Sequence, residues 1–373
     1  MGSKGSKAKR TKPINEYQIY TLGIAGVGKS TLQKQIQIIY NEGFTEADRS
    51  KYKNILITNI IVGFQDIVSY LEKHDEWPDE AMVKKCRFVK SLIVADCTNE
   101  FGWVTQIKDL WKDEVIKKGF SALSTDPRVS MLSHHMTKID DYINPGYLLS
   151  DDDILRARQR TTGSVCLEAT INKSIWKIID VGGQGVEREK WAGIIENETT
   201  TNTRSVKGKV ILFFISLIDY NVPSSEDPTK TNFQISEELF EDVIQTFMTD
   251  DEFILILCLN KIDEFEKKIQ IPTELESFKK CFPDYVHREL RRGKTQSKTR
   301  TMSVSTETDD PTIPMTNYLG GRFKKILKSK SKQEETDDMS IYVTCGLDTN
   351  MIKQTIRGIV ESMFNKTIRD LDI

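Results

Sequence analysis

Gly23-Ile24-Ala25-Gly26-Val27-Gly28-Lys29-Ser30-Thr31 matches the phosphate-loop pattern G-x-x-x-x-G-K-[ST]. The apolar run 19–22 before it predicts a strand, and the apolar spacing of 32–39 after it predicts a helix. A strand that turns into a helix presents backbone N–H groups and a helix N-terminus, so this turn suits an anion. Lys29 is expected to reach the β- and γ-phosphates of a nucleotide, and the Ser30 hydroxyl to bind Mg²⁺.

Composition excludes several classes of protein. The 373 residues suffice for two domains of about 100–200 residues each. Lys and Arg total 53 against 55 Asp and Glu, a net charge of −2 that gives no bias toward nucleic acid. The six cysteines form no C-x-x-C pair and there are four histidines, which favours a reducing compartment over disulfides or zinc. The most apolar stretches, 210–218 and 253–259, are shorter than the roughly 20 residues of a membrane span and are typical of buried parallel strands.

The N-terminus fits a lipid-anchor pattern. Met1 to Ser6 matches M-G-x-x-x-[ST], so Gly2 is a candidate for N-myristoylation. One acyl chain binds membranes only marginally, and a basic cluster supplies the second signal toward anionic lipid. We therefore predict a basic, acylated segment at 1–13 that holds the protein at the cytoplasmic face of a membrane, the alternative being a solvated tail. The cluster consists of Lys4, Lys7, Lys9, Arg10 and Lys12.

Residues 45–153 have an almost wholly helical pattern. Tyr52, Leu56, Ile60 and Phe64 recur every four residues, which predicts a long amphipathic helix. No catalytic cluster occurs in this segment. The adjacent His134 and His135 would point about 100° apart on a helix, so we expect surface histidines or hydrogen-bonded core histidines rather than metal ligands.

A second phosphate-site motif follows a predicted hairpin. Strand patterns at 165–170 and 174–179 are joined by a turn at 172–173, and the second runs into Asp180-Val181-Gly182-Gly183-Gln184. This is the D-x-x-G element of GTP-binding switches. Asp180 is expected to hold a Mg²⁺-bound water, the Gly183 N–H to approach the γ-phosphate, and Gln184 to orient the attacking water.

The motif Asn260-Lys261-Ile262-Asp263 follows the buried strand at 253–259 and fits N-K-x-D. Its aspartate can accept from both N1–H and the exocyclic amine of guanine, which adenine does not offer. A carboxylate left unpaired against the wrong base would cost several kcal/mol, on the order of a buried unsatisfied charge. The motif alone is weak evidence, but downstream of the other two it predicts guanine selection and disfavours a metabolic kinase or ATPase.

Residues 288–338 differ in composition from the rest of the chain. Blocks of like charge and few apolar residues predict a mobile insertion at 288–313. It is either a docking or phosphorylation loop or a tolerated surface insertion. The segment 341–344 then predicts a last strand, followed by a C-terminal helix.

With these motifs in place, the chain from about Tyr17 to its C-terminus resembles the α subunits of heterotrimeric G proteins. Small GTPases share the three nucleotide motifs but lack the helical segment and the arginine-bearing switch. The matching stretches are Ile154-Leu155-Arg156-Ala157-Arg158-Gln159-Arg160-Thr161-Thr162-Gly163, Asp180 to Gln184 with Glu187-Arg188 and Trp191, 216–220, 260–263, Cys281-Phe282-Pro283-Asp284-Tyr285, and Thr344-Cys345 with Asp348-Thr349.

The resemblance implies an α/β fold: a Ras-like GTPase domain with a doubly wound, mostly parallel sheet at 14–44 and 154–373, and an inserted all-α domain at 45–153. It implies GTP/GDP and Mg²⁺ as ligands, Arg158 as an arginine finger, and Thr161 as the second hydroxyl on the metal beside Ser30. Implied partners are a βγ dimer, a G-protein-coupled receptor or other exchange factor, a GTPase-activating protein and an effector. The implied nucleotide-binding residues are Gly23, Ala25, Gly26, Val27, Gly28, Lys29, Ser30, Thr31, Leu155, Arg156, Arg158, Thr161, Asp180, Gly183, Asn260, Lys261, Asp263, Cys345 and Gly346.

Several positions depart from the family pattern. Ala25 replaces a glycine of the phosphate loop, and Gly26 replaces the glutamate that contacts the switch arginine. Ile235 stands where the family has a glutamate partner for Arg188, for which Glu237 or Glu238 is a candidate replacement. The segment before the first strand is short for a βγ contact. We therefore expect slow hydrolysis; the alternatives are a GTP-binding scaffold with negligible hydrolysis and a small-GTPase-like regulator not coupled to βγ.

Overall fold

The computed structural model describes residues 15–77, 79–98, 100–124, 126, 128–200, 206–248, 252–285, 310–330 and 339–369. The predicted acylated segment 1–13, with Gly2, lies outside these residues. So does most of the predicted insertion at 288–313.

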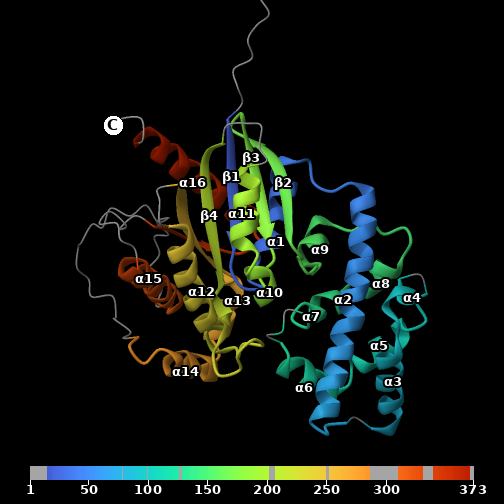
Figure 1. Cartoon of the computed structure of the whole chain (residues 1–373). Helices are drawn as coiled ribbons and strands as arrows, with labels where there is room; N and C mark the ends of the chain where they lie inside the picture. Colours follow the sequence, from blue (N-terminus) through green and yellow to red (C-terminus); the bar gives the residue numbers. More distant parts are fainter. Residues whose placement is uncertain are drawn as a thin grey trace, which may run out of the picture.

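A six-stranded sheet forms the centre of the larger part of the molecule (Figure 1). Its order is β2-β3-β1-β4-β5-β6; β2 runs antiparallel to β3, and the other neighbours are parallel. The hairpin turn predicted at 172–173 is present, and both of its residues have positive φ. The strands are β1 (Glu16–Leu22), β2 (Ser164–Ile171), β3 (Ser174–Val181), β4 (Val206–Ser216), β5 (Phe253–Asn260) and β6 (Ser340–Thr344).

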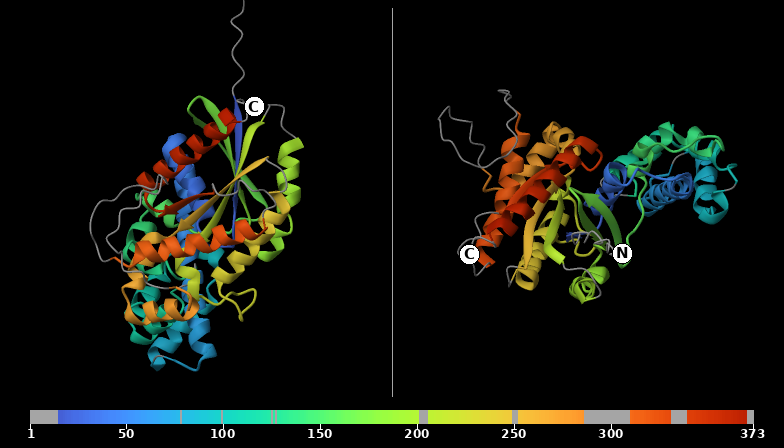
Figure 2. Two further views of the ribbon diagram at one scale, coloured as in Figure 1. Left: turned by 90° about the vertical axis from the view of Figure 1, so that its left-hand side faces the viewer. Right: turned by 90° about the horizontal axis from the view of Figure 1, so that it is seen from above.

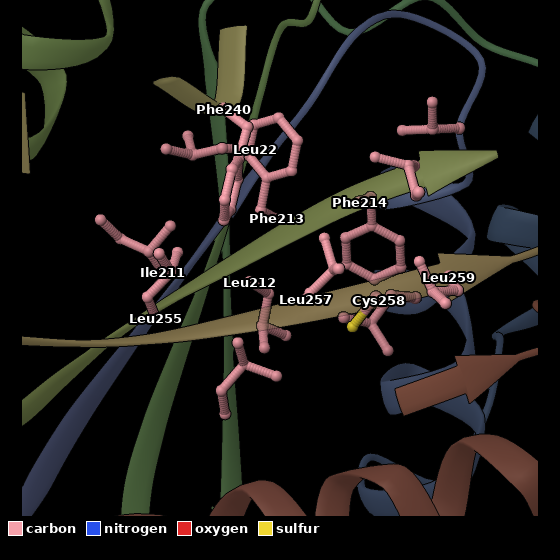
Figure 3. Packing of buried hydrophobic residues seen from close by; sticks show 14 of the residues in the cluster. Leu22, Ile211, Leu212, Phe213, Phe214, Phe240, Leu255, Leu257, Cys258 and Leu259 are labelled. Atoms are coloured by element: carbon pink, nitrogen blue, oxygen red, sulfur yellow. The ribbon is translucent and has the colours of Figure 1, made fainter. Parts of the chain in front are cut away.

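Helices cover both faces of the sheet, because its parallel strands are apolar on both sides. Helices α1 and α16 contact each other, and α12 contacts α15 (Figures 1 and 2). Phe213 of β4 packs on Phe240 of α12, with ring centroids 5.0 Å apart (Figure 3). The helices of this part are α1 (Lys29–Tyr40), α10 (Gly185–Arg188), α11 (Trp191–Thr200), the 3-10 helix η1 (Leu217–Asn221), α12 (Asn232–Phe247), α13 (Ile262–Ile269), α14 (Pro272–Cys281), α15 (Thr312–Lys330) and α16 (Thr349–Arg369).

A second, wholly helical block stands beside the sheet (Figure 1). Its long helix α2 (Glu46–Lys73) begins at the N-cap Thr45, which forms a capping box with Asp48. By length and composition α2 could cross a membrane, but half of its apolar window is buried, and its apolar face packs in the core of the block. The other helices are α3 (Glu80–Ser91), α4 (Val94–Cys97), α5 (Val104–Leu110), α6 (Glu114–Ala122), α7 (Leu132–Thr137), α8 (Ile139–Ile143) and α9 (Asp151–Arg156).

The two apolar clusters are separate, one around the sheet and one within the helical block. The chain leaves the sheet after α1 and returns through α9 into β2, and Lys34 of α1 contacts the returning segment by donating to the Ile154 carbonyl at 2.9 Å. The expectation of a surface or hydrogen-bonded His135 is wrong: its ring is 1% exposed, and neither nitrogen has a hydrogen-bond partner. Burial lowers the pKa of His135 to about 3, so it packs as a neutral ring against Tyr142.

Candidate functional site

A cleft of about 610 Å³ opens at the carboxyl ends of the parallel strands. Four of these strands, β1, β3, β5 and β6, lead into segments that line the cleft, as expected of a ligand site in an open α/β sheet. The cleft is lined by residues from the phosphate loop, the 155–162 segment, the end of β3 and the loops after β5 and β6. All the predicted nucleotide-binding residues line it except Gly23 and Val27.

The phosphate loop follows a path that its glycines require. Gly23, Gly26 and Gly28 have φ of 132°, 83° and 106°, the left-handed region that favours glycine. A Cβ at Gly28 would lie 2.1 Å from the Asn260 amide nitrogen, and one at Gly23 would lie 2.3 Å from the Phe214 carbonyl oxygen. Only glycine fits at these two positions without a shift of the backbone or its neighbours.

Lys29 begins α1 and points back under the loop. Its Nζ donates to the carbonyl oxygens of Gly23 and Ile24, both at 2.7 Å. Burial lowers its pKa to about 8, and Asp180 partly opposes this shift. Gly183 comes close to this ammonium, because a Cβ there would lie 2.3 Å from Nζ. The two phosphate motifs therefore converge on one buried cation.

Three oxygen-bearing side chains converge beside this lysine. Ser30 Oγ donates to Asp180 Oδ2 at 2.6 Å and lies 2.9 Å from Thr161 Oγ1, which donates to the same carboxylate oxygen at 3.0 Å. Thr21 fixes the other oxygen of Asp180 with a 3.0 Å hydrogen bond. Two hydroxyls and a carboxylate form a hard oxygen donor set, which fits Mg²⁺ rather than a softer metal. Sequence reasoning missed Thr21, although it stands at the end of β1.

Asn260 holds the opposite end of the cleft together. Its Nδ2 donates to the Val27 carbonyl at 2.7 Å, and its Oδ1 accepts from the Thr344 hydroxyl and the Gly346 N–H at 3.0 and 3.1 Å. Lys261 has a left-handed φ of 65° as N-cap of α13. One buried amide thus joins the phosphate loop, β5 and the loop after β6. This arrangement brings Asp263, Cys345 and Gly346 to the same side of the cleft.

Arg158 lies where the chain returns from the helical block. Its backbone N–H donates to Asn59 Oδ1 at 2.7 Å, and Asn59 Nδ2 donates to its carbonyl at 2.9 Å. The guanidinium Nη1 lies 3.8 Å from Asp126 Oδ1 in the helical block. The neighbouring Arg156 pairs with Asp152, because its Nη2 donates to Asp152 Oδ1 at 3.0 Å. No signal in the sequence marked Asn59 or Asp126 as neighbours of the predicted arginine finger.

The segment after β3 contains a second arginine pair. Gln184 is the N-cap of the short helix α10 and lines the cleft. Arg188 pairs with Glu226, in the loop before α12. The expectation that Glu237 or Glu238 replaces the missing glutamate is wrong, because these residues pair with Arg322 and Lys230. Glu226 reaches Arg188 because its loop folds back toward α10, which spacing along α12 could not indicate.

The sequence matches a known protein family. The sequence profile of the family described as "G-protein alpha subunit" matches residues 3–363. The chain belongs to the G-protein α-subunit family. The family assignment and the observed sheet and helices establish a Ras-like α/β fold with an all-α part, and the function of a guanine-nucleotide-binding signalling protein.

Similarity to individual family members is low but extends along the chain. The chain is 26% identical to a guanine nucleotide-binding protein alpha-2 subunit of Mycosarcoma maydis, over 95% of this chain and 90% of that one. It is also 26% identical to an alpha-2 subunit of Dictyostelium discoideum, over 96% and 92%. An alpha-4 subunit of Caenorhabditis briggsae is 26% identical over 99% and 98%. The chain is thus a divergent member matched over almost its full length.

Proposed function

We propose that this family member binds GTP with Mg²⁺ and hydrolyses it slowly to GDP, as a switch at the cytoplasmic face of a membrane. The observation that carries the proposal is the convergence of Lys29, Ser30, Thr161 and Asp180 within one cleft whose other end is built around Asn260. The cleft of about 610 Å³ would then have a phosphate end and a base end, which suits a nucleotide better than a free anion.

The phosphate end is assigned by charge and by exposed backbone. Lys29 would exchange its two carbonyl partners for oxygens of the β- and γ-phosphates, a stronger hydrogen bond because both groups are charged. Gly183, without a side chain, would let its N–H approach the γ-phosphate. Ser30 and Thr161 would hold Mg²⁺ directly, and Asp180 would do so through water. When bound there, Mg²⁺ supplies positive charge against the phosphate oxygens.

Hydrolysis needs a water molecule in line with the γ-phosphate and a positive charge close to the transferred phosphoryl group. Gln184 would orient that water, and Arg158 would place its guanidinium on the developing charge. Two residues of the phosphate loop support slow turnover. The methyl group of Ala25 would displace Gln184 or the attacking water, and Gly26 has no side chain that could hold Arg158. Asp263 would select guanine. The N–H groups of Cys345 and Gly346 donate to Met351 Sδ and Asn260 Oδ1, and each would have to leave its acceptor to bind the guanine carbonyl.

The organisation around the site is also part of the proposal. Residues 14–44 and 154–373 would form the GTPase domain, and 45–153 the inserted helical domain that closes over the nucleotide. Partners would be a receptor or other exchange factor, a GTPase-activating protein, an effector and a βγ dimer. Myristoylation of Gly2 with the basic cluster would anchor the protein. Gly2→Ala should then move it from the membrane to the soluble fraction, whereas Ser3→Ala should not.

Single-turnover hydrolysis of GTP tests the enzymatic proposal. Gln184→Leu should lower the rate by about 10²-fold, the usual contribution of a group that handles the reacting water, and leave the Kd for GTP unchanged. Gln159→Leu is the matched control, because Gln159 also lines the cleft with an exposed side chain. Equal rates for wild type and Gln184→Leu would remove Gln184 from the mechanism. Tight GTP binding with no hydrolysis in any variant would favour the non-hydrolysing scaffold.

A further inference from the structure

Four charged side chains meet where the helical block faces Arg158. Arg128 Nε lies 3.2 Å from Asp66 Oδ2 of α2, and its Nη2 lies 3.2 Å from Asp126 Oδ2. Arg158 Nη1 lies 3.8 Å from the other oxygen of Asp126. The cluster is electrically balanced, two arginines against two aspartates. Arg158 is its only member outside the helical block, so the cluster joins the block to the predicted arginine finger.

The backbone of Arg158 is fixed, but its side chain is held loosely. Asn59 makes two hydrogen bonds to the backbone of Arg158. The guanidinium Nη1 is buried and makes no hydrogen bond of its own, so charge attraction at 3.8 Å holds it. A guanidinium with an unsatisfied N–H gains a hydrogen bond when it moves to a phosphate oxygen.

The charged groups that act on this guanidinium lie in the helical block. The phosphate loop from Gly23 to Gly28 contains no acidic residue, and Asp180 is hydrogen-bonded by the hydroxyls of Thr21, Ser30 and Thr161. In the described part of the chain, Asp126, Arg128 and Asp66 are therefore the charged groups that act on Arg158. The Arg158 guanidinium thus lies against Asp126.

We propose that Asp126, supported by Asp66, is a positioning residue that holds the Arg158 guanidinium on the helical block, away from the γ-phosphate. This inference rests on the proposed GTPase activity. Arg158 must leave this carboxylate to reach the transferring phosphate, so the cluster lowers the fraction of bound GTP that is ready to react. A partly exposed ion pair at this distance is weak, and its removal should accelerate hydrolysis about two- to fivefold.

Asp126→Asn is the variant that isolates this effect. The backbone N–H of Arg128 donates to Asp126 Oδ1 at 2.7 Å. The side-chain oxygen of an asparagine can accept the same hydrogen bond, so the substitution removes the charge and keeps the local backbone conformation. Single-turnover hydrolysis should become two- to fivefold faster with the Kd for GTP unchanged, and Asp126→Glu should restore the wild-type rate. The acceleration should disappear in an Arg158→Ala background. Asp140→Asn, at a surface pair with Lys108, is the matched control and should have no effect.

Hydrolysis that is unchanged or slower in Asp126→Asn would overturn the proposal. An equal acceleration in the Arg158→Ala background would also overturn it, because Asp126 would then act without the arginine.

A second measurement keeps the outcome separate from that of the proposed function. If wild type binds GTP but never hydrolyses it, the GTPase proposal fails, and the pairing is judged from thermal unfolding of the GDP-bound protein. Asp126→Asn and Arg158→Gln should then shift Tm non-additively, by about 1 °C for so weak a pair. With GDP, Mg²⁺ and aluminium fluoride, which occupies the γ-phosphate position, the coupling should vanish. Additive shifts with GDP alone would refute the pairing.

Discussion

Nucleotide affinity should depend on pH through Lys29. Burial lowers the pKa of this lysine to about 8, whereas phosphate oxygens in contact with Nζ would raise the pKa well above this value. At pH 7 the lysine is charged in both states, so binding moves no proton. Above pH 8 the free protein has a neutral lysine, and binding must take up a proton. Affinity therefore falls as pH rises, by the factor 1 + 10^(pH − 8), or about fourfold between pH 7 and pH 8.5.

The assay is the Kd of a non-hydrolysable GTP analogue from pH 6.5 to 8.5, measured with Mg²⁺ in excess and at constant ionic strength. Calorimetry in buffers of different ionisation enthalpy should show proton uptake at pH 8.5 and almost none at pH 7. Lys29→Arg is the control: arginine stays charged, so binding would be weaker but independent of pH in this range. A flat wild-type profile, or the same slope in Lys29→Arg, would refute the assignment of Lys29 as the buried phosphate-binding cation.

Three further predictions concern base choice, turnover and the switch segment. Asp263→Asn should lose GTP and gain xanthosine triphosphate, because the amide donates where xanthine offers a carbonyl; nucleotide competition measures this. Ala25→Gly should raise the single-turnover rate, up to about 10²-fold if the methyl group displaces the attacking water, with GTP affinity nearly unchanged; an equal or slower rate contradicts it. Glu226→Gln should lower the free energy of unfolding by about 0.2–1 kcal/mol and alter Trp191 fluorescence on binding of a GTP analogue, whereas Glu238→Gln should leave that signal unchanged.

Local patterns indicated most of the fold because they depend on short-range rules. The phosphate loop lies between β1 and α1, as its flanking apolar runs predict, and the turn at 172–173 joins β2 to β3. The motifs after β1, β3, β5 and β6 meet in one cleft because all four strands are parallel and end at the same edge. The roles assigned to the residues of these motifs remain predictions.

Contacts between distant loops could not be predicted in this way. Asn59, Asp126 and Glu226 belong to no motif, and each contacts its arginine across a separation in sequence of at least 30 residues. Their positions follow from how the helical block packs and how the loop before α12 folds back, which no periodicity encodes. His135 shows the same limit: pattern reasoning expected a polar environment, but tertiary packing buries the ring.

Arg158 and Arg188 share one feature, which links the departures from the family pattern. Arg158 lacks an acidic partner at Gly26, and Arg188 lacks one at Ile235, yet each has a carboxylate partner supplied by a loop. Asp126 comes from the helical block and Glu226 from the loop before α12, so neither partner lies on the element that the family pattern indicates. A loop-borne partner can move independently of the nucleotide motifs. The orientation of each arginine therefore depends on the position of a neighbouring segment, and we expect a ligand that displaces the helical block or this loop to release the corresponding arginine.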